Sequence, residues 1–291
     1  MIAFFHKYFL FHKAEHIERP ARALAAYKAL KESNVKIIKP KLLEEGKVKE
    51  YLYLIHDKNY VDKIWDLLNK RKEIWLDSDT YISPRTKESI IASVSSVVQA
   101  VELLKDEDKI IILNRPPGHH SGYHGLANGT LGFCIFNFAA LAAVLLGKAI
   151  ILDIDLHHGN GTEDIIRGKG GLYYISTHAK GIYPGTGYES YENIYNFPLE
   201  WYTSDEEYIN IFNRIKETIE DLNIENIVVS LGWDAHKKDP LSVLNLTLKS
   251  YKYVFEFLKP YKVIFILEGG YNLRVIYKGY KLLAKVFAKN V

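Results

Sequence analysis

Cysteine is almost absent from this sequence, since Cys134 is the only one among 291 residues. An intrachain disulfide and a zinc finger built on cysteine pairs are therefore excluded. Long apolar runs are also missing, because no stretch approaches the roughly 20 residues that cross a bilayer. Near the amino terminus, His6 and Lys7 interrupt the apolar residues, so no signal peptide is expected there. We expect a cytoplasmic protein with no membrane partner.

The sequence has no strong excess of charge of either sign. Its 38 basic and 35 acidic residues leave a net charge of +3, which is too small to favour nucleic acid as a specific partner. Low-complexity linkers, internal repeats and breaks in composition are absent as well, so we expect one domain spanning residues 1–291. The 48% hydrophobic content is enough for a sizeable core. None of these features favours a particular oligomeric state.

Short apolar segments alternate with longer segments of helical periodicity. Strands are predicted over residues 2–5, 109–113, 149–154, 171–176, 226–231 and 262–267. Helices are predicted over residues 21–32, 58–70, 85–104, 136–146, 205–223, 242–258 and 273–288. This alternation predicts an α/β fold with a central, mostly parallel sheet and helices on both faces.

Five of the predicted strands run directly into polar or glycine-containing segments. These segments are 114–120, 155–158, 177–181, 232–234 and 268–271. In open α/β sheets, ligands bind at the carboxyl ends of the strands. We therefore expect the polar residues of these segments to form one site.

The segment from Asp153 to His157 is the strongest indication of a metal. Side chains alternate along a strand, so Asp153, Asp155 and His157 are expected to point the same way. Burying two carboxylates and an imidazole is costly unless a cation compensates them. Asp234, after another strand, can supply a third ligand, and three such ligands with an open fourth position are typical of catalytic zinc. Fe²⁺ and Co²⁺ accept the same ligands.

Two adjacent histidines, His119 and His120, follow another strand. Histidine can accept and donate a proton near neutral pH, as hydrolysis by an activated water requires. A carboxylate or an amide must orient such an imidazole, and Asp153 and Asn160 are the candidates. The pair therefore indicates general acid–base chemistry beside the metal.

Three loops are expected to complete the pocket. The glycines of segment 269–270 allow a tight turn that can present Tyr271 as a hydrogen-bond donor to a developing oxyanion. The turn-rich segment 183–187 is expected to form a wall. Residues 77–80 are interpreted as a cap of the helix that follows, and a contact from Asp79 to the substrate is the second interpretation.

Together these motifs resemble the zinc-dependent histone deacetylase and acetylpolyamine amidohydrolase superfamily. The matching segments are 115–120, 132–134, 153–161, 183–187 and 268–272, with looser matches at 18–22 and 79–83. The resemblance implies an arginase/deacetylase-type fold with a sheet of about eight strands. It also implies removal of an acetyl or other short acyl group from an amine, such as acetyl-lysine or an acetylated polyamine. Asn160, where class I members carry aspartate, is similar to the class II and bacterial or archaeal branch.

The resemblance further implies a role for each site residue. The zinc ligands would be Asp155, His157 and Asp234. The catalytic residues would be His120 with Asn160 behind it, His119 paired with Asp153, and Tyr271. Substrate contacts would come from Asp79, Gly132, Phe133, Tyr183 and Gly270. A structural potassium ion would bind at Asp153, Asp155, His157, Ser176 and Thr177.

Two other functions are weighed against this one. A ureohydrolase with two Mn²⁺ ions would need a further Asp-x-Asp pair near Asp234, whereas Ala235 and His236 follow it. A non-catalytic module that binds acyl ligands would be expected to lack a metal ligand or Tyr271.

Segment 121–131 is longer than in many members of the family, and segment 12–20 is shorter than in dimeric polyamine deacylases. The substrate, the acyl length and the native metal stay open.

Overall fold

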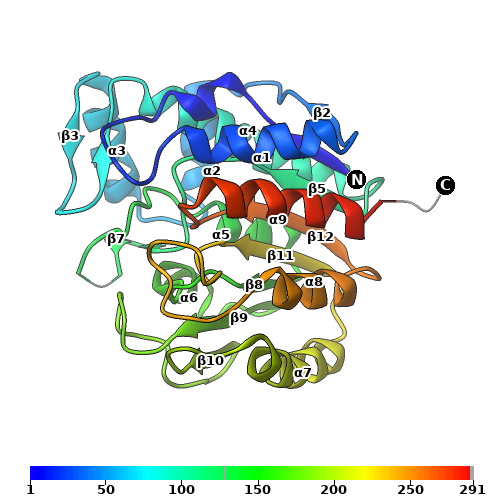
Figure 1. Ribbon diagram of the computed structural model, residues 1–291. Helices are drawn as coiled ribbons and strands as arrows, with labels where there is room; N and C mark the ends of the chain where they lie inside the picture. The colour runs from blue at the N-terminus through cyan, green and yellow to red at the C-terminus, as the bar shows by residue number, and fades with distance from the viewer. Residues whose placement is uncertain (128, 289–291) are drawn as a thin grey trace.

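Eight parallel strands form the central sheet of the computed structural model, which describes residues 1–127 and 129–288 (Figure 1). The strands are β1 (Ile2–Phe4), β2 (Lys36–Ile38), β5 (Lys109–Ile112), β8 (Ala149–Asp153), β9 (Leu172–Ala179), β10 (Ile194–Leu199), β11 (Asn226–Leu231) and β12 (Lys262–Leu267). Their spatial order is β10-β9-β8-β11-β12-β5-β1-β2, and all neighbouring pairs are parallel. The predicted α/β fold is confirmed.

Helices cover both faces of this sheet. They are α1 (Ala21–Glu32), α2 (Glu45–Leu52), α3 (Lys58–Asn69), α4 (Thr86–Leu103), α5 (Phe138–Leu146), α6 (Asn160–Ile166), α7 (Asp205–Leu222), α8 (Leu248–Phe257) and α9 (Leu273–Val286), with a 3₁₀ turn at Lys7–Leu10. Helices α1 and α9 lie side by side although they come from opposite ends of the chain (Figure 1). Among the described residues, no helix is long and apolar enough to span a membrane.

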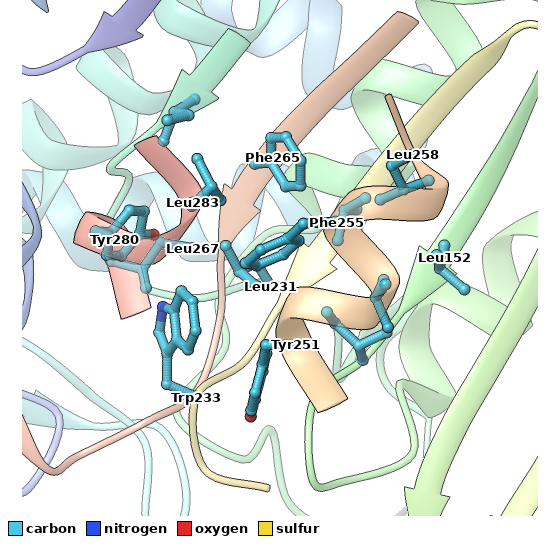
Figure 2. Close-up of a cluster of buried hydrophobic side chains, with 14 of the residues drawn as sticks. Leu152, Leu231, Trp233, Tyr251, Phe255, Leu258, Phe265, Leu267, Tyr280 and Leu283 are labelled. Carbon is cyan, nitrogen blue, oxygen red and sulfur yellow. The ribbon is translucent and has the colours of Figure 1, made fainter. Parts of the chain in front are cut away.

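Alternation along each strand divides the core into two apolar layers. In β12, Val263, Phe265 and Leu267 join the layer under α1, α7, α8 and α9, whereas Ile264 and Ile266 join the layer under α2 to α6. Figure 2 shows the first layer, where Trp233 stacks on Tyr251 with ring centroids 4.8 Å apart. This packing holds the loop after β11, which carries Asp234, against the rest of the core.

Two short hairpins lie outside the sheet. Strands β3 (Ile74–Trp75) and β4 (Tyr81–Ile82) pair antiparallel, as do β6 (Ser121–Gly122) and β7 (Gly125–Leu126). The predicted helix cap at residues 77–80 is wrong, because the Asp77 carboxylate accepts hydrogen bonds from the backbone of Asp79 and Thr80 and closes the turn of the first hairpin. Helix α4 begins later, at Thr86.

The remaining differences from the predicted elements lie at element ends and at sheet edges. Helix α8 begins at Leu248, six residues after the predicted start, because the Thr247 side chain caps it by accepting from the Lys249 amide. Strand β9 continues through Ala179, so the predicted loop at Thr177 and His178 is part of the strand. The prediction omitted β2 and β10, which are the two edge strands, and also omitted α2 and α6.

Candidate active site

The predicted site residues gather at the carboxyl ends of four adjacent strands. Asp155 and His157 follow β8, Asp234 follows β11, Tyr271 follows β12, and the two histidines of residues 119–120 follow β5. These four strands are neighbours in the order β8-β11-β12-β5. The chain order reverses between β8 and β11, which is where open α/β sheets form their ligand crevice.

Asp155, His157 and Asp234 form a compact group of potential metal ligands, in which the two carboxylates are buried and the imidazole is half-buried. One ligand atom of each residue lies within 4.8 Å of the others. The His157 Nδ1 atom is 3.2 Å from Asp155 Oδ1 and 3.3 Å from Asp234 Oδ2. The second Asp155 oxygen accepts the Gly269 amide at 2.7 Å, and the second Asp234 oxygen accepts the Leu156 amide at 3.1 Å. The backbone therefore holds both carboxylates toward the imidazole.

The electrostatics of this group fit a bound cation. Burial and the adjacent charge of Asp155 raise the pKa of Asp234 to about 6. Burial opposes ionisation of Asp155 too, but His119 and His157 keep its pKa well below the ordinary value. Asp234 Oδ2 is buried and has no hydrogen-bond partner, although it lies beside His157. A buried carboxylate oxygen without a hydrogen-bond partner is rare in proteins unless a ligand binds to it. These residues therefore fit a divalent metal.

The two histidines are oriented by different partners. The His120 Nδ1 atom is 2.8 Å from the Asn160 side-chain oxygen, so the ring carries its proton on Nδ1 and leaves Nε2 as an acceptor. The His119 Nδ1 atom is 3.0 Å from Asp153 Oδ2. Burial would lower the pKa of His119, but Asp155 and Asp153 raise it to about 10. The hydrogen bond to Asn160 therefore leaves His120 Nε2 able to accept a proton, whereas the neighbouring carboxylates favour the charged form of His119.

Two buried side chains hold the backbone of residues 118–120 in place. The sequence prediction gave neither of them a role. Glu268 Oε2 accepts the Gly118 amide at 2.7 Å and the His119 amide at 3.3 Å. Cys134 Sγ accepts the His120 amide at 3.4 Å. Both residues lie inside the motif segments, but their contacts span sequence separations of 14 to 150 residues. Sequence spacing alone does not reveal such contacts.

The turn before Tyr271 requires its two glycines. A Cβ atom on Gly269 would collide with Asp234 Oδ2, and Gly270 has a φ of +101° and would place a Cβ atom 2.6 Å from the Trp233 Cβ. The carboxylate of Asp239 accepts the Tyr271 amide at 2.6 Å. Burial raises the pKa of the Tyr271 phenol well above its ordinary value, so the hydroxyl stays protonated and can donate.

These groups surround a cavity of about 250 Å³. Its lining comprises Asp79, Pro117, His119, His120, Gly132, Phe133, Asp155, His157, Tyr183, Leu241, Gly269 and Tyr271. Phe133 has a φ of +69°, an uncommon value for a non-glycine residue, and its amide donates to the Thr80 hydroxyl at 3.0 Å. Its ring meets the Tyr271 ring edge-on, with centroids 5.8 Å apart. Backbone strain held in this way is often found at functional sites.

The described residues of segment 121–131 do not line this cavity, but they hold two residues that do. The Thr130 hydroxyl donates to Asp79 Oδ2 at 2.9 Å, and the Tyr183 hydroxyl donates to the Thr130 carbonyl at 2.8 Å. Four further histidines, His124, His158, His178 and His236, are not among the lining residues. Gly270 is also outside the lining, although its neighbours on both sides belong to it.

Two of the five residues predicted to bind potassium, Asp155 and His157, also belong to the group of potential metal ligands. Asp153 and Ser176 are register partners on β8 and β9. A separate cavity of about 10 Å³ is lined by Asp155, Thr177 and Tyr251, among others. The Tyr251 hydroxyl is buried and has no hydrogen-bond partner. A cavity of this volume is about large enough for one species the size of a water molecule.

A buried ion cluster that was missed by the site prediction supports the Tyr271 turn. Both oxygens of Glu18 accept from Arg115, at 2.6 and 2.5 Å, and one accepts from Arg22 at 2.7 Å. Arg22 also donates to the carbonyls of Glu268 and Gly270, and its guanidinium lies 4.9 Å from the Tyr271 ring centre. The sequence signals for it were the loosely matching segment 18–22 and Arg115 at the start of the matching segment 115–120.

Replacing Glu18 by glutamine is expected to lower the free energy of unfolding at pH 7 by about 3–5 kcal/mol, because two guanidinium groups lose their buried counter-charge. Burial opposes ionisation of Glu18, but Arg115 and Arg22 depress its pKa. The stabilisation is therefore complete above the ordinary carboxyl pKa of about 4.3 and is lost as the pH falls below it. Denaturant unfolding at several pH values measures both effects.

The exposed Glu15, three residues before Glu18, provides the matched control for this measurement. The Glu15→Gln variant should unfold like the wild type at every pH. Equal stability of the Glu18→Gln variant and the wild type at pH 7 would contradict the assigned role of the cluster.

Comparisons with known proteins agree with this geometry. A family model described as the histone deacetylase domain matches residues 16–287. Protein MJ0535 of Methanocaldococcus jannaschii is 38% identical over 283 residues, which cover 91% of this chain and 80% of that protein. The crystal structure of the HDA15 HD domain has a TM-score of 0.88 at 28% identity and covers 99% of this chain and 90% of that one. An acetylpolyamine aminohydrolase from Burkholderia pseudomallei shares the fold, with a TM-score of 0.87 at 20% identity and coverage of 99% and 98%.

Proposed function

This chain belongs to the histone deacetylase family, and we propose that it is a zinc-dependent deacylase that removes an acetyl or other short acyl group from an amine. The observation that carries this proposal is the convergence of three kinds of group on one cavity. Two of the three potential metal ligands, Asp155 and His157, border it together with an oriented pair of histidines and a protonated tyrosine, and the third ligand, Asp234, lies beside His157. We also propose that residues 1–291 form a single catalytic domain.

Asp155, His157 and Asp234 would hold the zinc ion. When bound there, zinc would act as a Lewis acid on the amide carbonyl and would lower the pKa of water. Asp155 accepts the Gly269 amide on one oxygen and the His157 amide on the other, which still has a lone pair for the metal, whereas Asp234 accepts the Leu156 amide on one oxygen and has the other without a hydrogen-bond partner. A potassium ion bound at the residues around Asp153 and Ser176 would compensate the negative charge of the carboxylates that zinc does not compensate.

His120 would act first as the base and then as the acid. Its Nε2 atom, left unprotonated by the hydrogen bond from Nδ1 to Asn160, would accept the proton of the attacking water. Tyr271 would donate a hydrogen bond to the oxygen on which negative charge develops. His120 would then return the proton to the departing nitrogen, so that amide and water become carboxylate and free amine. His119, whose pKa is raised to about 10 by the carboxylates of Asp155 and Asp153, would stabilise the same negative charge.

Substrate would enter past Asp79, with Gly132, Phe133 and Tyr183 along the channel and Gly270 supporting its base. A cavity of about 250 Å³ with aromatic walls suits a narrow, extended acyl-amine chain. The polar end of the substrate would meet Asp79 at the mouth. Acetyl-lysine in a polypeptide and an acetylated polyamine both have such a chain.

The two other functions have less support. The second group of potential ligands, His119, Cys134 and Glu268, has one carboxylate, and both Cys134 and Glu268 already accept backbone hydrogen bonds. It differs from the carboxylate-rich second site that a two-manganese enzyme needs. A non-catalytic binding module has no use for a tyrosine hydroxyl and an oriented base beside the ligands.

The test is release of acetate by zinc-loaded protein from acetyl-lysine peptides and from acetylated polyamines. We expect acetate and free amine in equal amounts from at least one of the two classes. Bound metal without acetate release from either class would favour the binding module, and two metal ions per chain with hydrolysis of a guanidinium substrate would favour the ureohydrolase.

A further inference from the structure

A second hollow lies beside the reaction cavity and is lined mainly by apolar side chains. It has a volume of about 190 Å³, and we call it the side groove. Helix α3 contributes Tyr60 and Ile64, the β3–β4 hairpin contributes Trp75 and Leu76, and the chain around the β6–β7 hairpin contributes Leu126 and Leu131. None of these six residues lines the reaction cavity.

The side groove and the reaction cavity share one wall. Leu131 lines the groove while the next two residues, Gly132 and Phe133, line the cavity. The β3–β4 hairpin likewise has Trp75 on the groove and Asp79 on the cavity. The two hollows therefore draw on the same two segments, the β3–β4 hairpin and residues 131–133, and are neighbours.

Hydrogen bonds make this wall rigid. The Asp77 carboxylate accepts the Leu131 amide at 2.7 Å, and the Asp79 carboxylate accepts the Thr130 hydroxyl at 2.9 Å. The Phe133 amide donates to the Thr80 hydroxyl at 3.0 Å. Each bond joins the hairpin to segment 130–133, so the relative position of groove and cavity is fixed.

Two large apolar side chains of the side groove are exposed to solvent. Trp75 is 48% exposed and Leu126 is 55% exposed, and they belong to one continuous hollow rather than to scattered positions. Contiguous exposed apolar surface commonly marks a binding site. Lys63, which also lines the groove, is positively charged, and no acidic residue is among the lining residues.

We propose that the side groove binds an apolar side chain of a polypeptide substrate, one to three residues away from the acylated lysine. This inference rests on the proposed function and deepens it. An extended chain advances about 3.3–3.6 Å per residue, so a peptide whose lysine occupies the cavity carries its next side chains across the shared wall. A polyamine has no apolar branch, and its second ammonium would lose hydration in an apolar groove beside Lys63. The groove therefore favours protein acyl-lysine over polyamine.

The test compares acetyl-lysine peptides that differ at one flanking position, leucine or serine, and includes acetyl-lysine amide, which has no flanking residues. For the wild type we expect a kcat/KM about 10-fold higher with leucine at one of the positions from −3 to +3, as burial of part of an apolar side chain predicts. The variants Leu126→Asp and Trp75→Ala should lose this preference through a higher KM and should hydrolyse acetyl-lysine amide like the wild type.

Leu24, which is 43% exposed on α1, provides the matched control, since Leu24→Asp should keep the preference. Equal kcat/KM for leucine and serine peptides at every position in the wild type would overturn the inference, as would a preference that survives in both groove variants. A dimer that Leu126→Asp dissociates, without an effect on peptide preference, would show that a second copy of the chain occupies the groove and would also overturn it. If neither acetyl-lysine amide, nor the peptides, nor an acetylated polyamine releases acetate, the proposed function itself has failed, whereas release from the polyamine alone would overturn the inference and leave the proposed function standing.

Discussion

Replacing Tyr271 by phenylalanine is expected to lower kcat by about 10²–10³-fold, because the reaction loses one donor to the developing oxyanion. The substitution removes only the hydroxyl. The turn is held by the Asp239 carboxylate through the Tyr271 amide, and Arg22 lies against the ring face, so both contacts are kept in the variant. Metal content and KM should therefore stay close to those of the wild type, which assays of zinc and steady-state kinetics on the same sample would measure.

Tyr183 is the matched control for this substitution, since it lines the same cavity but donates its hydroxyl to the Thr130 carbonyl. Tyr183→Phe should retain most of the turnover. Full activity of the Tyr271→Phe variant at equal zinc content would refute the role of the phenol.

Replacing His120 by alanine is expected to lower kcat/KM by about 10²–10⁴-fold, the usual contribution of a general acid–base group. Burial lowers the pKa of His120, and the positive charge of His119 lowers it further. The wild-type residue is therefore a neutral base at pH 7, and activity should fall only as the pH drops below the ordinary imidazole pKa of about 6.5. The exposed His124 serves as control, since His124→Ala should leave the profile unchanged.

The partner of His120 provides a second test of the same role. An aspartate in place of Asn160 would put a negative charge beside the Nδ1 atom and stabilise the imidazolium. The pKa of His120 would rise, so the acid limb of the pH–activity profile should move to higher pH by about one unit or more. An acid limb that does not move in Asn160→Asp would show that His120 is not the titrating base.

The central strands could be predicted because each is a buried run of apolar residues with a polar end. The edge strands were missed for a physical reason, since β2 is only three residues long and partly exposed, and β10 contains Pro198. Proline is tolerated in edge strands and argues against a strand when only the sequence is seen. The start of α8 depends on the Thr247 cap, which an apolar pattern does not show.

The site residues were predictable where their chemistry is concentrated in a short motif at the end of a strand. Residues that act through contacts with distant parts of the chain could not be predicted, because the fold determines which residue each of them contacts. Glu18 reaches Arg115 across 97 positions of the chain, and Asp239 reaches the Tyr271 amide across 32. The side groove likewise draws on three separate segments that have no common motif.

The most direct test of the central claim is a zinc titration of metal-free protein with simultaneous measurement of acetate release from an acetyl-lysine peptide. We predict that activity is absent without metal, rises in proportion to bound zinc and reaches its plateau at one ion per chain. The Asp155→Asn and Asp234→Asn variants should bind zinc far more weakly. Acetate release by the metal-free protein, or a plateau reached only at two ions per chain, would contradict the account.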